Sequence, residues 1–446
     1  MLRQTESPIV FIQQLGRGLR KFEDKEYVVI LDFIGNYSNS YMIPLALSGD
    51  RSYNKDTLRK YVQSGNRIIP GTSTVHFDAI AKKRIFAAID TANLSSAKLI
   101  KEAYLDLKYK LGHIPRIKDF KDYGSIDITK IFNKYKSYHH FLTQIKDKDY
   151  KTVFTPIQEQ MLHFISQKLA TGIRVRDLVA LQLLISGECK IINKVSEVLL
   201  NQYGIQLSEQ GKVNLINTLT NQFNVASAKK TFSECIFIIK KGKDYIISNS
   251  FQRALENDDF KMHVQELIVY GLDRYLDKYR NGLVIGTPFA LYEKYNYEQV
   301  CQLLDWPHNE SSTIGGYKYS KETKTLPIFI NYDKDENIQE SIKYEDRFVE
   351  RDLFIGISKH PRTLKSKELA NIFDADKYGI CIHLFIRKNK NDKEKFKEFY
   401  YLGPVHSTGR KNAKQIQMAS GAKAVELEYR LDVPVRDDIY DYLLNG

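Results

Sequence analysis

The stretch Ile380–Lys388 reads ICIHLFIRK and decides the fold expected for the last third of the chain. Its aliphatic side chains fall at every second position, which predicts a strand with one apolar face. The stretch Val425–Val433 alternates in the same way, and Leu369, Ile372 and Phe373 share one face of an expected helix with Ser366 as its N-cap. We therefore expect a β-rich domain over residues 280–446, with a small curled sheet and one or two helices.

The expected loops of this domain are rich in positive charge, which attracts phosphates. They contain Lys388, Lys390, Lys393, Lys395, Lys397, Arg410, Lys411 and Lys414. Exposed tyrosines among Tyr317, Tyr319, Tyr344, Tyr400 and Tyr401 would stack on bases. We expect nucleic-acid binding by Lys393, Lys395, Lys397, Arg410, Lys411 and Tyr344, in a reader of a flipped or modified base. The alternative is a core of packed tyrosines beneath a solvated lysine loop, because the chain has 29 tyrosines to place.

The order of short motifs in this part of the chain resembles a known family. Leu303–Trp306, Gly315–Tyr317, Leu326–Tyr332 and Phe354–Ser358 precede the strand at Ile380–Lys388. This order closely resembles the domain of unknown function 3427, which many bacterial DEAD/DEAH-box helicases carry behind the motor. The resemblance implies a family and leaves the mechanism open.

A second motif lies near the start, where Phe11–Arg20 reads FIQQLGRGLR. On a helix, Gln13, Arg17 and Arg20 share one face, and two guanidinium forks suit a nucleotide γ-phosphate. The run resembles motif VI of superfamily II helicases. The resemblance implies that Arg17 and Arg20 act as catalytic arginine fingers, with Gln13 and Gly16 beside the bound ATP. An ordinary amphipathic helix with surface arginines is the alternative.

The stretch Glu26–Asn36 reads as a buried strand ending in a Gly-Asn turn, as found after motif VI. Residues 1–62 are therefore expected to form a partial RecA-like helicase C-terminal lobe. The phosphate-cradling motif G-x-x-x-x-G-K-[ST] does not occur in the sequence. We expect ATP and Mg²⁺ to bind only when the missing motor half is supplied, with no cofactor for this chain alone. A split or truncated helicase gene, or a separate N-terminal helicase/nuclease polypeptide as partner, would explain this.

The middle of the chain reads as helical. Residues 63–150 are expected to form a helical linker in which Leu111–Phe120 and Tyr135–Leu142 look like a helicase-associated repeat, either contacting DNA or purely structural. Residues 151–279 are expected to form a helical, winged-helix-like domain, because helices precede a hairpin turning at Lys241-Gly242-Lys243. A wing of this kind contacts phosphates or mediates protein contacts.

Composition bounds the possible functions. The chain has 446 residues, enough for about three domains, and a formal net charge of +13, which attracts polyanions. Its four cysteines are far apart and form no C-x-x-C, so neither a zinc site nor a disulfide framework is expected. The sequence has neither a signal peptide nor an apolar run of about 18 residues, which indicates a cytoplasmic protein without a membrane partner.

Together these features predict a multidomain α/β and α+β chain with three possible functions. The leading interpretation is the C-terminal part of an ATP-dependent helicase or translocase, acting on DNA rather than RNA and linked to restriction or phage defence, inactive as an isolated chain. The alternative is a stand-alone nucleic-acid-binding protein. A third is a metal-dependent nuclease built on Glu345, Asp346, Glu350 and Asp352, although no D…E-x-K arrangement supports it and no metal ligands are assigned.

Overall fold

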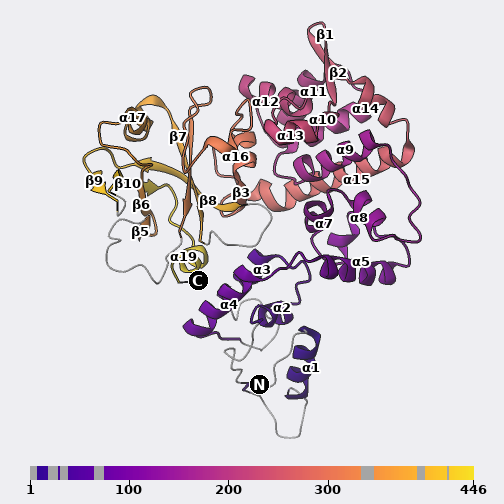
Figure 1. Cartoon of the computed structure of the whole chain (residues 1–446), viewed down its shortest axis with the longest axis horizontal. Coiled ribbons are helices and arrows are strands. Elements are labelled where there is room, and N and C mark those ends of the chain that lie inside the picture. Colours follow the sequence, from indigo (N-terminus) through magenta and orange to yellow (C-terminus); the bar gives the residue numbers. More distant parts are fainter. Residues whose placement is uncertain are drawn as a thin grey trace.

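The computed structural model describes residues 8–18, 29–30, 39–64, 75–332, 346–388, 397–418 and 421–445. The fold is a mixed α/β arrangement in which helices dominate the first 280 residues and a large mixed sheet dominates the rest. Figure 1 shows three parts, which we call the N-terminal region (residues 8–94), the helical region (97–282) and the sheet domain (283–445).

The regular elements described in the N-terminal region are all helices. Its helices are α1 (Pro8–Gly18), α2 (Met42–Ser48), α3 (Lys55–Ser64) and α4 (Ala79–Thr91). Asp78 caps α4 by accepting a hydrogen bond from the N–H of Ala81 at 2.7 Å, and the predicted apolar face of this helix is buried. Val29 and Ile30 lie in no regular element, and the rest of the strand expected at 26–36 lies outside the described residues. The predicted RecA-like lobe is therefore not confirmed.

The helical region confirms the helices expected in the middle of the chain. Ser96 caps α5 by accepting from the N–H of Leu99 at 3.2 Å, and the helix ends at Gly112, whose φ is 74°. The helices are α5 (Ala97–Leu111), α6 (Asp119–Asp122), α7 (Ile128–Tyr135), α8 (Tyr138–Gln144), α9 (Pro156–Phe164), α10 (Val175–Ile185), α11 (Ile191–Val198), α12 (Glu209–Leu219), α13 (Ala226–Thr231), α14 (Asn249–Ala254) and α15 (Asp258–Arg274). Short π-helical or 3₁₀ turns follow at η3 (Ile165–Leu169), η4 (Leu199–Tyr203), η5 (Tyr275–Tyr279) and η6 (Arg280–Gly282).

A hairpin projects from this region, as predicted. Strands β1 (Ile238–Lys241) and β2 (Asp244–Ile247) pair antiparallel, with Lys241 opposite Asp244. The two loop residues are Gly242 and Lys243, and Gly242 has a φ of 64°. A glycine with positive φ at the first loop position is typical of a type II′ turn, whose twist matches the strands. The hairpin carries exposed lysines, and its role as a nucleic-acid-binding wing stays a prediction.

The sheet domain contains an eight-stranded mixed sheet. The strand order is β4-β7-β8-β10-β6-β5, with β3 added to β8 and β9 added to β10. Only β4 and β7 pair in parallel among these neighbours. The strands are β3 (Lys294–Asn296), β4 (Thr325–Asn331), β5 (Arg347–Glu350), β6 (Leu353–Ile357), β7 (Cys381–Arg387), β8 (Glu398–Ser407), β9 (Lys414–Gln417) and β10 (Lys423–Leu431). The helices are α16 (Tyr297–Leu303), η7 (Ser311–Thr313), α17 (Lys367–Phe373), α18 (Ala375–Tyr378) and α19 (Asp437–Asn445).

The sheet separates two hydrophobic cores. Ile382, Leu384 and Ile386 of β7 belong to a core shared with the N-terminal region, whereas Phe385 on the opposite face belongs to the core of the helical region. The strand at Ile380–Lys388 is therefore confirmed as a central strand that is buried on both faces. The sheet is larger than the small sheet we expected, because β3, β5 and β9 have only 3, 4 and 4 residues, too few to show a clear alternation.

Two details of the predicted sheet domain were wrong. The hydroxyl of Ser366 accepts from the N–H of Thr363 and makes no capping bond to α17, although Leu369 and Ile372 of that helix are buried. Val433 lies beyond the end of β10 and is 44% exposed.

A buried polar network fastens the N-terminal region to the sheet domain. Arg59 of α3 pairs with Asp90 of α4, and both side chains are about 5% exposed or less. The hydroxyl of Tyr442, on α19, donates to Asp90 at 3.2 Å. Asp56 pairs with Lys294 of β3 at 2.9 Å. Burial alone would raise the pKa of Asp56, but Lys294 and Arg59 outweigh it and hold this pKa far below its usual range.

Candidate nucleic-acid interface

The sheet curls so that its first and last strands in the strand order, β4 and β5, approach each other. Tyr332, directly after β4, and Phe348 of β5 have ring centroids 5.9 Å apart. The Tyr332 hydroxyl also accepts from the N–H of Phe348 at 3.5 Å. A hollow is left in this seam, between β4 on one side and β6 on the other.

This hollow, which we call the seam cavity, has a volume of about 410 Å³. Its walls come from the segment before β4, from β4 itself, from the segment before β5, and from the end of β6 with the residues after it. They include Gly315, Gly316, Tyr317, Phe329, Asn331, Asp346, Gly356, Ser358, Lys359, His360 and Tyr429. The lining therefore combines aromatic rings, one carboxylate and exposed backbone, the combination typical of ligand sites.

Asp346 is held in place by the backbone of β6. Its Oδ1 accepts from the N–H of Ile357 at 2.7 Å. A Cβ on Gly356 would lie 3.3 Å from the ring of Tyr429 and 3.8 Å from Oδ1 of Asp346, so glycine lets both side chains lie close against this strand. Burial raises the pKa of Tyr317 to about 12, which keeps its hydroxyl protonated.

Two successive glycines form one wall of the seam cavity. Gly315 and Gly316 have φ of 50° and 96°, which other residues rarely adopt. The carbonyl of Gly316 accepts from the N–H of Phe329 at 2.6 Å, which ties this wall to β4. Because no side chain covers these residues, a ligand can approach their backbone closely.

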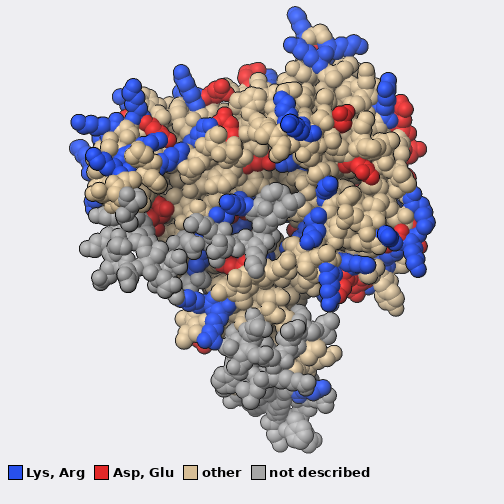
Figure 2. Space-filling model, viewed as in Figure 1, with Lys and Arg blue, Asp and Glu red and all other residues tan. Residues whose placement is uncertain are grey.

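Basic side chains lie along one side of the seam cavity. Lys359 and His360 line its rim, and the loop after them is tied to the β9–β10 hairpin, since the N–H of Arg362 donates to the carbonyl of Lys423 at 3.0 Å. Figure 2 shows many Lys and Arg side chains over this side of the sheet domain. We call this surface the basic ridge and define it by the exposed Lys365, Lys367, Arg410, Lys411, Lys414 and Lys423.

The predicted nucleic-acid-binding residues do not form one cluster. Lys397 is exposed before β8, whereas Arg410 and Lys411 are exposed after it. Strand β8 has ten residues, about 30 Å at ~3.3 Å per residue, so the two groups lie at opposite ends of the strand. Lys393, Lys395 and Tyr344 lie outside the described residues. Their roles stay predictions.

Most of the tyrosines expected to be exposed are buried. Tyr317 and Tyr400 are each 4% exposed, and Tyr401 is fully buried. Tyr400 donates to Asp56 in the interface with α3, and the Tyr401 hydroxyl lies 3.0 Å from Nδ1 of His383. The alternative of tyrosines packed in the core therefore holds for Tyr400 and Tyr401, whereas Tyr317 also lines a cavity.

The expected nucleotide-contacting residues lie on α1. Gln13, Gly16 and Arg17 are exposed there, while Phe11 is 2% exposed on the packed side. This is the polar stripe that the sequence predicted. Arg20 lies outside the described residues, so the pair of arginines cannot be placed together. Contact with ATP stays a prediction.

Neither a metal site nor a membrane span is found in the part of the chain that the structure describes. No three of its His, Cys, Asp or Glu side chains are grouped to hold a metal ion. Of the proposed nuclease acids, Asp352 pairs with Arg430 at 2.7 Å, and Glu345 lies outside the described residues. None of the described helices is both long and apolar enough to cross a bilayer.

Two family models match the chain. Residues 289–443 match the domain of unknown function DUF3427, and residues 100–278 match the domain of unknown function DUF8090. The chain therefore contains a DUF3427 domain, as its motifs indicated, and this domain coincides with the sheet domain. No curated protein matches the chain.

Some solved structures match at low similarity. One is the SRA domain of SUVH5 bound to fully hydroxymethylated CG DNA, with 14% identity over 35% of this chain and 95% of that chain and a TM-score of 0.23. Another is KRYPTONITE in complex with mCHH DNA, an H3 peptide and SAH, with 11% identity over 35% of each chain and a TM-score of 0.24. A third is Arabidopsis thaliana SUVH6 in complex with SAM, with 10% identity over 63% of this chain and 41% of that chain and a TM-score of 0.24. TM-scores of this size do not define a shared fold.

Sequence reasoning missed the seam cavity. It considered Tyr317 for stacking and Asp346 for metal binding, but nothing in the sequence placed them together. The other walls come from Gly356 and Tyr429, which are far from Tyr317 in the sequence. The one available signal was the Gly315-Gly316 pair, because consecutive glycines often mark a backbone conformation that other residues rarely adopt.

Proposed function

We propose that this chain binds nucleic acid through its sheet domain and takes one unpaired base into the seam cavity. The observation that carries the proposal is the lining of this cavity, where the rings of Tyr317, beneath the ammonium group of Lys359, and Tyr429 border the carboxylate of Asp346. A base is a flat ring with donors and acceptors on its edge, and flipped bases are read by stacking together with hydrogen bonds to that edge. DNA is the expected partner.

The basic ridge supports the same proposal. It begins beside Lys359 and His360 at the rim of the cavity, so a base inside the cavity would have its backbone phosphates near this ridge. Contacts between lysines and phosphates supply affinity for every sequence, and contacts to the base edge supply preference. The two contributions can therefore be tested separately.

Asp346→Asn tests base preference. An asparagine Oδ1 can still accept from the N–H of Ile357, but the second oxygen becomes a donor. The full chain is titrated with DNA and RNA hairpins that carry a single bulged C, A, G or T/U. We expect the wild type to prefer bases with an amino group, and Asp346→Asn to lower that preference by about tenfold.

The control is Asp352→Asn, which makes the same change in charge at a carboxylate outside the cavity that pairs with Arg430. It should leave base preference unchanged. Replacing both Lys365 and Lys423 with Gln should weaken binding to all four hairpins alike. The proposal fails if no hairpin binds at low salt, or if Asp346→Asn and the wild type rank the four bases identically.

We also infer that α1 contributes to ATP hydrolysis by a motor half on another polypeptide. The exposed stripe of Gln13 and Arg17 favours this role, because both side chains are free of the packed face that holds Phe11. In a reconstituted motor, Arg17→Ala should slow ATP turnover on the order of 10³-fold with little loss of nucleic-acid binding. Normal turnover in this variant would remove the inference.

A further inference from the structure

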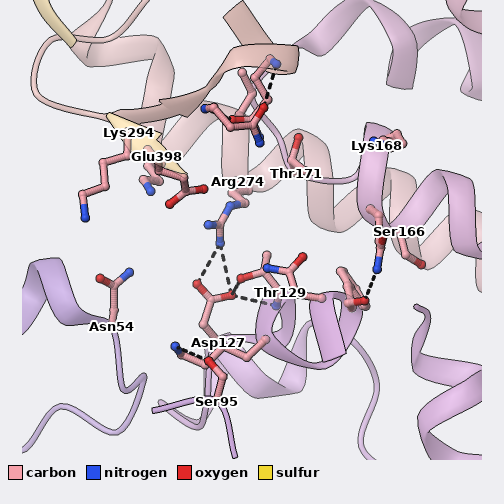
Figure 3. A pocket seen from close by; sticks show the side chains of 18 of the residues that line it. Asn54, Ser95, Asp127, Thr129, Ser166, Lys168, Thr171, Arg274, Lys294 and Glu398 are labelled. Carbon is pink, nitrogen blue, oxygen red and sulfur yellow. Dashed lines mark hydrogen bonds and ion pairs between the residues drawn. The ribbon is translucent and has the colours of Figure 1, made fainter. Parts of the chain in front are cut away.

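A second, larger cavity lies where the three parts of the molecule meet. Its volume is about 630 Å³, within the range of ~300–1,000 Å³ that is usual for small-molecule sites. Figure 3 shows side chains from all three parts around it: Asn54 from the N-terminal region, Asp127 and Arg274 from the helical region, and Lys294 and Glu398 from the sheet domain. We call it the junction cavity.

One side of the junction cavity is held by an ion pair within the helical region. Asp127 precedes α7 and accepts from the N–H and hydroxyl of Thr129 at 2.9 and 2.7 Å. Its carboxylate also lies 3.3 Å from Nη1 of Arg274, the last residue of α15. Burial would raise the pKa of Asp127, but Arg274 and Thr129 outweigh it and keep this carboxylate ionised. The guanidinium is therefore fixed at the cavity wall.

The lining carries more positive than negative charge. Seven lysines and arginines line the junction cavity, against four aspartates and glutamates. Lys168 and Lys294 are paired, with Glu298 at 2.7 Å and with Asp56 at 2.9 Å.

Two lysines of the lining remain without an acidic partner among the described residues. Lys130 donates to the hydroxyl of Ser95 at 3.3 Å, and Lys134 lies one turn further along α7. Two ammonium groups on one helix, next to a fixed guanidinium, make a wall that attracts anions.

Two buried groups of this lining have unused hydrogen-bonding capacity. The hydroxyl of Ser166 belongs to a side chain that is 2% exposed, and it has no hydrogen-bond partner in the described part of the chain. The same holds for Nε of Arg274. Both atoms are fully enclosed by protein, so neither contacts the open cavity, and contacts to a ligand would come from the outer nitrogens of Arg274 and from the lysine ammonium groups.

We propose that the junction cavity is a binding site for a nucleotide-sized ligand that carries several phosphates. The guanidinium of Arg274 and the ammonium groups of Lys130 and Lys134 would bind the phosphate oxygens, because charged donors make the strongest hydrogen bonds to such acceptors. A free nucleotide and the phosphorylated end of a nucleic-acid strand offer the same chemistry.

Such a ligand would touch all three parts of the molecule at once. Asn54 directly precedes α3, Lys130 lies on α7, and Lys294 lies on β3. Binding would therefore hold the N-terminal region, the helical region and the sheet domain in this arrangement. The proposal is independent of base binding in the seam cavity.

The test uses the full chain and inorganic tripolyphosphate as the probe. Binding is measured by titration calorimetry at low salt without magnesium, for the wild type and for a variant with both Lys130→Gln and Lys134→Gln. Neither lysine has an ion-pair partner in the described part of the chain, so this variant should fold. Its affinity for tripolyphosphate should be on the order of tenfold lower.

A variant with both Lys101→Gln and Lys118→Gln is the matched control. It removes the same charge from exposed positions of the helical region that lie outside the cavity lining, Lys101 on α5 and Lys118 before α6, and it should bind tripolyphosphate as the wild type does. Asp346→Asn, in the seam cavity, should also leave this binding unchanged. Failure of base reading and failure of the junction site are therefore distinguishable.

Competition identifies the source of the phosphates. Displacement of tripolyphosphate by ATP, but not by a 5′-phosphorylated oligonucleotide, assigns the site to free nucleotides. Stronger displacement by a 5′-phosphorylated than by an unphosphorylated oligonucleotide assigns it to strand ends. The proposal is overturned if tripolyphosphate shows no saturable binding to the wild type, or if the control pair weakens binding as much as Lys130→Gln with Lys134→Gln.

Discussion

The seam cavity and the junction cavity differ in both chemistry and construction. The seam cavity lies within one domain and offers Tyr317, Tyr429 and a single carboxylate. The junction cavity is lined mainly by charged and amide side chains from all three parts of the chain. The first suits a flat base and the second suits phosphates, because stacking needs aromatic surface and oxyanions need fixed positive charge.

Their construction predicts different sensitivities. The walls of the seam cavity are joined by hydrogen bonds of one sheet, so changes in the N-terminal region should affect it less than the junction cavity, although Tyr317 and Tyr429 share a hydrophobic core with that region. The junction cavity depends on how α3 docks against the sheet domain, since Asn54, Lys55 and Asp56 form one of its walls. A chain can therefore lose one site and keep the other.

Arg59→Ala should give the largest difference between the two cavities. It leaves the carboxylate of Asp90 buried without its guanidinium partner, and breaking a buried pair in this way costs about 3–5 kcal/mol of unfolding free energy. Because α3 loses its anchor, tripolyphosphate affinity should fall, whereas base preference in hairpin titrations should persist. Denaturant unfolding measures the first effect and the two titrations measure the second.

Thr57→Ala, at an exposed position of the same helix, is the control and should change stability by less than about 0.5 kcal/mol. If base preference falls together with tripolyphosphate affinity in Arg59→Ala, the two cavities are not independent. If stability falls and tripolyphosphate affinity does not, α3 is not needed for the junction site.

Gly316→Val should affect the seam cavity and spare the junction cavity, the reverse of Arg59→Ala, and its cost in stability should be smaller. Its φ of 96° makes a valine strained, at a cost of about 1–3 kcal/mol, and the new side chain would enter the seam cavity. We expect hairpin titrations to show little remaining base preference, with tripolyphosphate binding unchanged at a temperature where the variant is folded.

Gly286→Val is the matched control, because Gly286 also has a positive φ, of 76°, with open space around its Cα, but lies outside both cavities. It should carry a similar cost in stability and keep base preference. Equal loss of preference in the two variants would mean that backbone strain, not occupation of the cavity, causes the effect.

Local patterns in the sequence predicted individual elements well. The turn at Lys241-Gly242-Lys243 was found in this way, because turns depend on a few neighbouring residues. The strand at Ile380–Lys388 was found in the same way. The grouping of the predicted nucleic-acid-binding residues did not follow from the sequence, since Lys397 and Arg410 are close in sequence and lie at opposite ends of β8.

The sequence by itself determined the helices, the hairpin, the central strand and the excess of positive charge, and its motifs identified the DUF3427 domain. Only the tertiary structure decided which charged side chains are available to bind a ligand. It pairs Arg59 with Asp90 inside the protein and leaves Lys130 and Lys134 at a cavity wall, although all are ordinary charged residues in the sequence. It also joins Gly316, Asp346 and Tyr429 in one cavity. The physical reason is that hydrogen bonding within helices and turns is local, whereas cavities form where segments distant in sequence pack together.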